Sequence, residues 1–198
     1  MKKLRLFGVA MSLVAIAVVL LLVALPSSAA GGAQHVRWDI ISLVGGKSPG
    51  PINPGGHASA MAPDGDTITL TGSGTFVAPA SGGGSSAVTG GGTWTTSSGG
   101  SGSYTVTGLV SWQMANFQPE PGPNIDNIDD GQKANGNAVL TIAFSDGSQG
   151  VLSVLCHGPG APPGILEGIA TTKGYKTYYE VGDAVPGVDA NRTVFHVQ

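Results

Sequence analysis

His157 and Glu167 are the two side chains of this sequence best suited, by type and position, to transfer protons. His157 ends an apolar run that begins at Val151, and strand alternation places it on the same face as Ser153 and Leu155. Glu167 alternates with isoleucines, so it points either inward among apolar side chains or onto a wet rim. An inward glutamate would have a raised pKa and could act as a general acid or base. The other interpretation makes His157 a strand-end histidine that hydrogen-bonds a neighbouring loop.

Cys156 is the only cysteine and directly precedes His157, an arrangement that suggests a nucleophile beside a base. Successive residues of a strand point to opposite faces, so the two side chains cannot pair without a bulge. One cysteine forms no intramolecular disulfide, and a free cysteine in an apolar run is typically buried. We therefore expect an inert thiol in the core.

An acidic segment in the middle of the chain is a candidate metal site. Asp126, Asp129 and Asp130 could offer carboxylate oxygens to calcium. Aligned to a calcium-binding loop from Asp126, the third position is Ile128 and the twelfth is Asn137, so two ligand positions fail. The histidines also lack the close spacing of zinc sites. We therefore expect a solvated acidic loop and no cofactor, with calcium binding as the alternative.

Aromatic residues have two open interpretations. Trp38, Trp94 and Trp112 lie on strand-like segments, where they could stack on a sugar, enclose an apolar ligand or supply core volume. A phrase of the form Gly-x-Gly-Thr/Ser-aromatic occurs three times, ending at Phe76, Trp94 and Tyr104. We interpret it as a device that bends strands and covers the bends with rings.

The elements that carry these residues are predicted to be strands. Alternating apolar residues, rich in β-branched and aromatic types, indicate about eight to ten strands and no helix. The clearest hairpin turns at Asp146-Gly147. A long strand over 104–114 is predicted to bury one face, Val110 included, and to wet the other, as antiparallel sheets do. The fold class is therefore all-β, an antiparallel meander closed as an up-and-down, calycin-like barrel, with a β-sandwich as the alternative.

The N-terminus has the pattern of an export signal. A positive start is followed by an apolar run over 6–25 and by small residues ending at Ala30. An uncleaved signal anchor is the alternative, because an apolar run of about 20 residues can span a bilayer. We expect a secreted or extracytoplasmic protein with no stable membrane association after cleavage. The predicted organisation is a signal peptide over 1–30, a flexible N-terminus over 31–33, and a single all-β domain over 34–198 with a long acidic loop at 118–136.

The composition limits the partners. Charged residues make up 11% of the chain, against about 25% in typical domains. Three of the nine basic residues fall in the predicted signal, which leaves six against twelve acidic residues and a net charge near −6. A nucleic-acid-binding protein needs a basic surface, so nucleic acid is not an expected partner.

Several short phrases resemble those of uncharacterised secreted bacterial proteins. They lie around Trp112, at Ser145–Gly147, at Cys156-His157 and over 189–193. The resemblance implies bacterial-type export and no particular activity. The expected barrel is similar to calycin-like and allene-oxide-cyclase-like architecture, an analogy of fold class from which no function follows.

The function expected from these features is non-enzymatic binding of a small apolar or glycan-like ligand, in the barrel mouth or on an aromatic strip. The first alternative is a small barrel enzyme of cyclase or isomerase type that uses His157 and Glu167. The second is a structural or adhesive surface protein. A hollow barrel interior would favour a binding protein or an enzyme, and a packed interior would favour a structural protein. Apolar and polar residues alternate along the strands in the same way in both cases. The oligomeric state is likewise not encoded in any pattern that we identify.

Overall fold

The computed structural model of the protein describes residues 32–43, 49–128, 130–180 and 191–198. The predicted signal peptide and Asp129 therefore lie outside the described residues. The strands belong to one compact unit within residues 31–198. The described ranges contain no helix with the length and apolar character needed to cross a membrane.

Every regular element in the described part of the chain is a strand, as the alternation predicts. In chain order the strands are β1 (Gln34–Leu43), β2 (Pro51–Pro54), β3 (Ala58–Met61), β4 (Thr67–Leu70), β5 (Ser73–Ala78), β6 (Val88–Thr96), β7 (Ser101–Phe117), β8 (Ile125–Asp126), β9 (Gln132–Phe144), β10 (Gln149–Cys156), β11 (Gly168–Lys173), β12 (Lys176–Tyr178) and β13 (Arg192–Val197).

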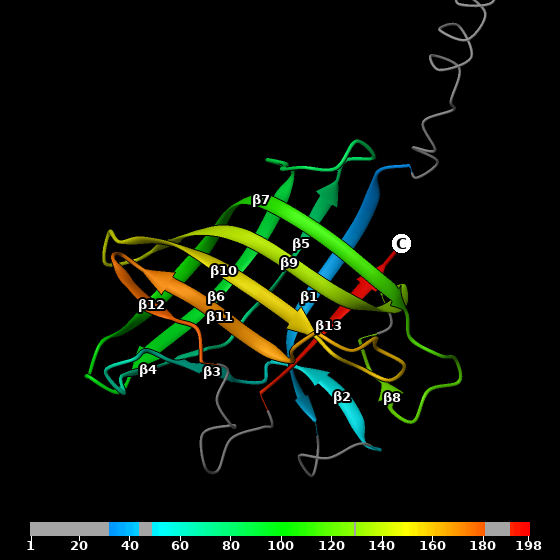
Figure 1. Cartoon of the computed structure of the whole chain (residues 1–198), viewed down its shortest axis with the longest axis horizontal. Helices are drawn as coiled ribbons and strands as arrows, with labels where there is room; N and C mark the ends of the chain where they lie inside the picture. The colour runs from blue at the N-terminus through cyan, green and yellow to red at the C-terminus, as the bar shows by residue number, and fades with distance from the viewer. Residues whose placement is uncertain (1–31, 44–48, 129, 181–190) are drawn as a thin grey trace, which may run out of the picture. The chain divides into compact units, whose positions relative to one another are not determined.

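A closed antiparallel ring forms the centre of the fold. Its order is β1, β5, β6, β7, β9, β13 and back to β1. Strands β10 to β12 continue the sheet from β9, and β4 and β3 continue it from β6. Figure 1 shows β7, β9, β10 and β11 crossing over β1, β5 and β6. The predicted all-β barrel is therefore confirmed.

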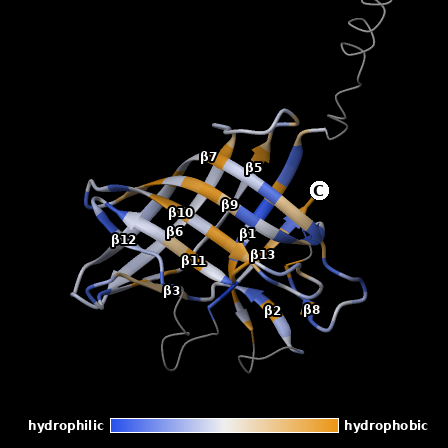
Figure 2. Ribbon diagram, in the orientation of Figure 1, coloured by the Kyte–Doolittle hydropathy of each residue, from blue (hydrophilic) through white to orange (hydrophobic). Residues whose placement is uncertain are grey.

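Packed side chains fill the space inside the ring. One continuous cluster of buried residues includes Trp38, Phe76, Leu140 and Phe195. Half-buried Trp112 joins it edge-on, with its ring centroid 5.5 Å from that of Phe76 and 4.6 Å from that of Phe195. Figure 2 shows hydrophobic stretches along β9 and β10 and a hydrophilic loop beside β8. The described interior is thus a core of side chains.

Aromatic rings cover glycines in the threefold phrase. A Cβ atom at Gly72 would lie 2.2 Å from the Tyr104 hydroxyl oxygen. That hydroxyl donates a 2.9 Å hydrogen bond to the Thr71 carbonyl. The Trp94 ring lies over Gly100 and Gly102, where an added Cβ would approach ring atoms to 2.9 Å. The structure thus supports the interpretation of bent, ring-covered strands for these two aromatic residues.

The alternation along β7 departs from the prediction at Val110. The pairing of β7 with β9 shifts between Val106 and Gly108 and again between Leu109 and Ser111. Leu109 is buried and Val110 is 46% exposed. The prediction that Val110 faces the core was wrong, because the extra residue of a bulge reverses the alternation.

The acidic loop is shorter than the predicted span of 118–136. Strand β9 begins at Gln132, so the last five predicted loop residues belong to a strand. Within the loop, β8 pairs in parallel with β2. The predicted hairpin at Asp146-Gly147 joins β9 to β10, and Gly147 has the positive φ of 89° that such a turn requires.

Candidate functional site

A pocket of about 290 Å³ opens where the ends of β1, β2 and β10 meet the starts of β11 and β13. We call it the Glu167 pocket. Its apolar wall consists of Ile41, Leu43, Ile52 and Val194, which form a small cluster separate from the main core. Polar side chains complete the lining, so one small space combines apolar and ionisable groups.

Glu167 lies on the pocket wall, one residue before β11. Its Oε1 accepts a 2.7 Å hydrogen bond from the backbone amide of Thr193, and its Oε2 accepts one from the backbone amide of His157. Burial raises the pKa of Glu167 to about 7, against the opposing effects of these two hydrogen bonds and of the Arg192 and His157 charges. The carboxyl group can therefore gain or lose a proton near neutral pH.

His157 lines the same pocket, directly after β10. Its Nδ1 donates a 2.7 Å hydrogen bond to the carbonyl of Ile165, which fixes the proton on that nitrogen. Nε2 has no hydrogen-bond partner among the described residues. The structure therefore brings His157 and Glu167 to one pocket, and it also shows the loop hydrogen bond of the alternative interpretation.

Arg192, the first residue of β13, brings a positive charge to the pocket. It pairs across the sheet with Ile41 of β1 and makes no ion pair within the described ranges. Its charge is close enough to act on the Glu167 carboxyl group. No local pattern predicts a role for Arg192, because only the pairing of β13 with β1 brings it to the pocket.

Asn135 holds the loop that follows His157. Its fully buried side chain accepts a 2.8 Å hydrogen bond from the Gly158 amide at Oδ1. Its Nδ2 donates to Pro159 O at 3.2 Å and to Asn116 Oδ1 at 3.1 Å. This positioning residue was also missed, because the polar, glycine-containing sequence around it predicts a loop instead of a buried strand. The bonds fix the pocket wall through side chains of β7 and β9.

Cys156 is buried and does not line this pocket. Burial raises the pKa of its thiol well above the ordinary value. Gln118 donates a hydrogen bond from Nε2 to Sγ at 3.7 Å. The expectation of a buried thiol is confirmed, and Cys156 and His157 do not form a dyad.

The three tryptophans have different surroundings. Trp38 is fully buried in the core, where its ring supplies core volume, the other interpretation of this residue. Trp94 is 4% exposed and lines a groove at the far end of β6. Trp112 is half-buried, and its Nε1 donates a 2.9 Å hydrogen bond to Gln34 Oε1. The structure does not bring them together as one aromatic strip.

Two of the candidate calcium ligands, Asp126 and Asp130, are held by basic side chains of the protein. Asp126 Oδ2 lies 2.7 Å from His196 Nε2 and 3.4 Å from Lys133 Nζ. Asp130 Oδ2 lies 3.4 Å from an Arg37 guanidinium nitrogen. Across the described ranges, no group of three or more histidine, cysteine, aspartate or glutamate residues could hold a metal ion. These carboxylates serve to fasten the acidic loop to β1, β9 and β13.

Comparison of the chain with protein-family models, with curated proteins and with solved structures gave no match.

Proposed function

We propose that the protein is a non-enzymatic extracytoplasmic binding protein for a small ligand with an apolar body and an acidic head group. The observation that carries this proposal is the Glu167 pocket, in which an apolar wall meets Arg192 and the open Nε2 of His157. Pockets that combine apolar walls with a few convergent polar groups are the usual ligand sites of proteins.

The pocket geometry supports a particular class of ligand. Its volume of about 290 Å³ lies at the lower limit of the range of roughly 300–1,000 Å³ for such sites. The ligand should therefore be small. A carboxylate head can accept hydrogen bonds from the Arg192 guanidinium, which forms no close ion pair in the described part of the chain. The apolar body would then lie against Ile41 and Ile52.

Short aliphatic and aromatic carboxylates test this proposal. Hexanoate, benzoate and phenylacetate should bind in calorimetric titrations, and the matching neutral amides should bind more weakly. Arg192→Ala should weaken carboxylate binding about tenfold, equal to about 1.4 kcal/mol, and Arg192→Lys should retain part of it because the charge remains. Arg37→Ala is the matched control, since Arg37 lies outside the pocket. Equal affinity of the wild type and Arg192→Ala for all carboxylate probes would overturn the proposal.

A cyclase or isomerase is the second candidate function. The observation that favours it is the Glu167 carboxyl group, whose pKa of about 7 suits proton transfer at neutral pH, beside the open nitrogen of His157. Such a pair could move a proton next to a carbonyl group. Deuterium exchange from heavy water into a bound ketone would then occur in the wild type. It should fall by about 10²-fold or more in Glu167→Gln. If a ketone binds without any deuterium exchange, the enzyme is contradicted and the binding protein remains the proposal.

A further inference from the structure

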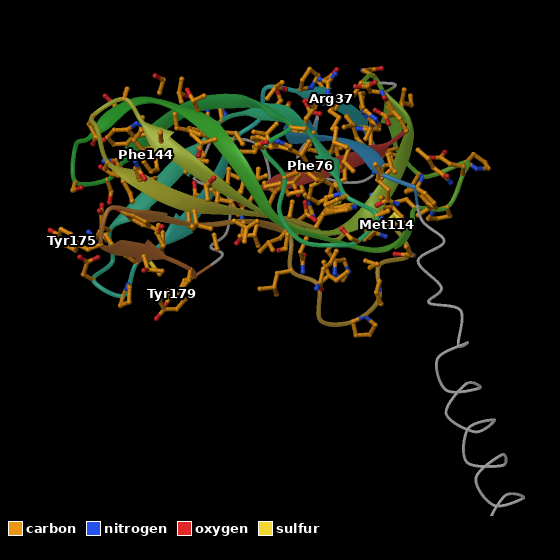
Figure 3. The ribbon with its side chains drawn as sticks, turned by 90° about the horizontal axis from the view of Figure 1, so that it is seen from above. Arg37, Phe76, Met114, Phe144, Tyr175 and Tyr179 are labelled. Atoms are coloured by element: carbon orange, nitrogen blue, oxygen red, sulfur yellow. The ribbon has the colours of Figure 1, made fainter. Side chains whose placement is uncertain are left out.

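A second concave site lies at the other end of the β10–β11 pair, remote from the Glu167 pocket. Its volume is about 560 Å³, and it is formed by the turns that join β3 to β4, β6 to β7, β9 to β10 and β11 to β12. We call it the hairpin-end groove. Figure 3 shows Tyr175 of this groove at one end of the molecule and Met114 at the other.

Aromatic side chains border the hairpin-end groove. The ring of Trp94 forms part of its floor, and Tyr178 donates a 2.9 Å hydrogen bond from its hydroxyl to Asp66 Oδ2. Tyr175, in the turn between β11 and β12, is fully exposed. A fully exposed tyrosine adds nothing to the core, whereas a ligand that covered its ring would bury apolar surface. The aliphatic face of a sugar ring is a suitable partner for an aromatic face of this kind.

Two lysines bring hydrogen-bond donors into the groove. Lys173 lies 4.2 Å from the centroid of the Trp94 ring, donates a 3.0 Å hydrogen bond to Ser148 Oγ and is paired with Asp146. Lys176 lies 2.7 Å from Asp66 Oδ2 and 2.9 Å from Asp64 Oδ2. The two positive charges therefore face three carboxylates. Since the charges nearly cancel, the groove favours a neutral ligand over a polyanion or polycation.

The acceptor groups are held in place before any ligand arrives. Asp66 Oδ1 accepts hydrogen bonds from the Ser97 hydroxyl at 2.6 Å and from the Ser98 amide at 3.0 Å. Hydrogen bonds from Lys176 lower the pKa of Asp66, and those from Lys173 lower the pKa of Asp146 to about 2. Both carboxylates therefore remain acceptors at neutral pH. A preorganised array of adjacent donors and acceptors reduces the entropy lost on binding.

We propose that the hairpin-end groove binds a neutral oligosaccharide, with one sugar ring stacked on Tyr175 and hydroxyl groups hydrogen-bonded to the lysine–aspartate pairs. Vicinal hydroxyl groups match this array because each can donate to a carboxylate and accept from an ammonium group. The site is separate from the Glu167 pocket, and neither proposal depends on the other.

Neutral trisaccharides test this inference by nuclear magnetic resonance titration of the purified protein. The probes are chitotriose, cellotriose, maltotriose and mannotriose, each added up to about 10 mM to reach weak affinities, with trigalacturonate as the anionic comparison. At least one neutral probe should shift the amide signals of residues that line the groove, and trigalacturonate should bind more weakly than that probe.

Tyr179 offers a matched control for Tyr175. It is 54% exposed, lies just after β12 and does not line the groove. Tyr175→Ala should weaken binding of the neutral probe about tenfold, whereas Tyr179→Ala and Arg192→Ala should leave it unchanged. The inference is overturned if no neutral probe shifts the groove signals, if trigalacturonate binds more tightly, or if Tyr179→Ala weakens binding as much as Tyr175→Ala.

Discussion

Glu167 Oε1 accepts a 2.7 Å hydrogen bond from the backbone amide of Thr193, the second residue of β13. Through its other oxygen the same carboxyl group holds the amide of His157 after β10. One partly exposed side chain thus joins two strands that both flank β9. The protonation of Glu167 should therefore affect the stability of the whole barrel.

The unfolding free energy should decrease as the pH rises from about 4.5 to 7. The folded-state pKa of Glu167 is about 7, above its ordinary value of 4.5, so the folded state holds this proton more tightly than the unfolded chain does. Stability from this proton is fully present below pH 4.5 and is lost as the pH rises through 7. The loss should be at most about 3.5 kcal/mol, from ~1.4 kcal/mol per pKa unit. Urea unfolding at several pH values measures it.

Glu167→Gln provides the control, because its side chain does not titrate. Two groups face Glu167 and remain present in the variant, His157 and Arg192. The difference in unfolding free energy between wild type and variant should therefore change across this pH range. A difference that stays constant from pH 4.5 to 8 would contradict the raised pKa.

Calcium should leave the melting temperature unchanged. Asp126 and Asp130 are paired with His196, Lys133 and Arg37, and a calcium ion would have to displace these side chains. Ligands that bind only the folded state raise its stability in proportion to the logarithm of their concentration. Melting curves with millimolar calcium and with a chelator should superimpose, and magnesium serves as the ionic-strength control. A rise that follows calcium concentration would instead support the alternative of a calcium loop.

Cys156 should resist alkylation in the folded protein. Its thiol is buried and its pKa is raised by burial, so little reactive thiolate forms. Iodoacetamide should modify it only at the rate at which the protein unfolds, and fully in strong denaturant. Mass spectrometry at intervals measures the rate. Rapid labelling of the native protein would show that the thiol is accessible.

Gly92→Ala should strongly destabilise the barrel. An added Cβ would lie 1.9 Å from the carbonyl oxygen of Thr71, which directly follows β4. Backbone atoms of β6 or of Thr71 would therefore have to move. Overpacking of this kind costs typically 1–3 kcal/mol and occasionally more, which corresponds to a melting temperature lower by several degrees. Gly32→Ala is the matched control, because a Cβ there meets nothing within 4 Å. Equal melting temperatures of the two variants would contradict the close approach.

Local features of the fold were predictable from the sequence. The Asp146-Gly147 turn and the alternation at Tyr104 and Val106 depend on neighbouring residues, and both are present in the structure. Val110 was predicted on the wrong face because bulges leave no periodic trace in sequence. The order of the ring was also hidden, since the pairing of β1 with β13 joins residues far apart in the chain.

The candidate site was predictable to the same extent. His157 and Glu167 lie at adjoining ends of neighbouring strands, so their meeting follows from one hairpin-like connection. Arg192 and Ile41 reach the pocket through the pairing of β13 with β1. No local pattern contains that pairing. His157 and Glu167 could therefore be predicted from the sequence, whereas Arg192 and the apolar wall could not.

The pairing of β13 with both β1 and β9 also determines when the barrel can close. During synthesis β1 emerges early, and its partner edge is absent until β13 has been made. Until then β1 presents an unpaired edge over 36–41, and β9 lacks its β13 partner at 132–134. An unpaired strand edge is a template for pairing with other chains. Such non-local closure is slow, and intermediates with open edges aggregate readily. The nascent chain is therefore most exposed to aggregation in the interval before β13 docks.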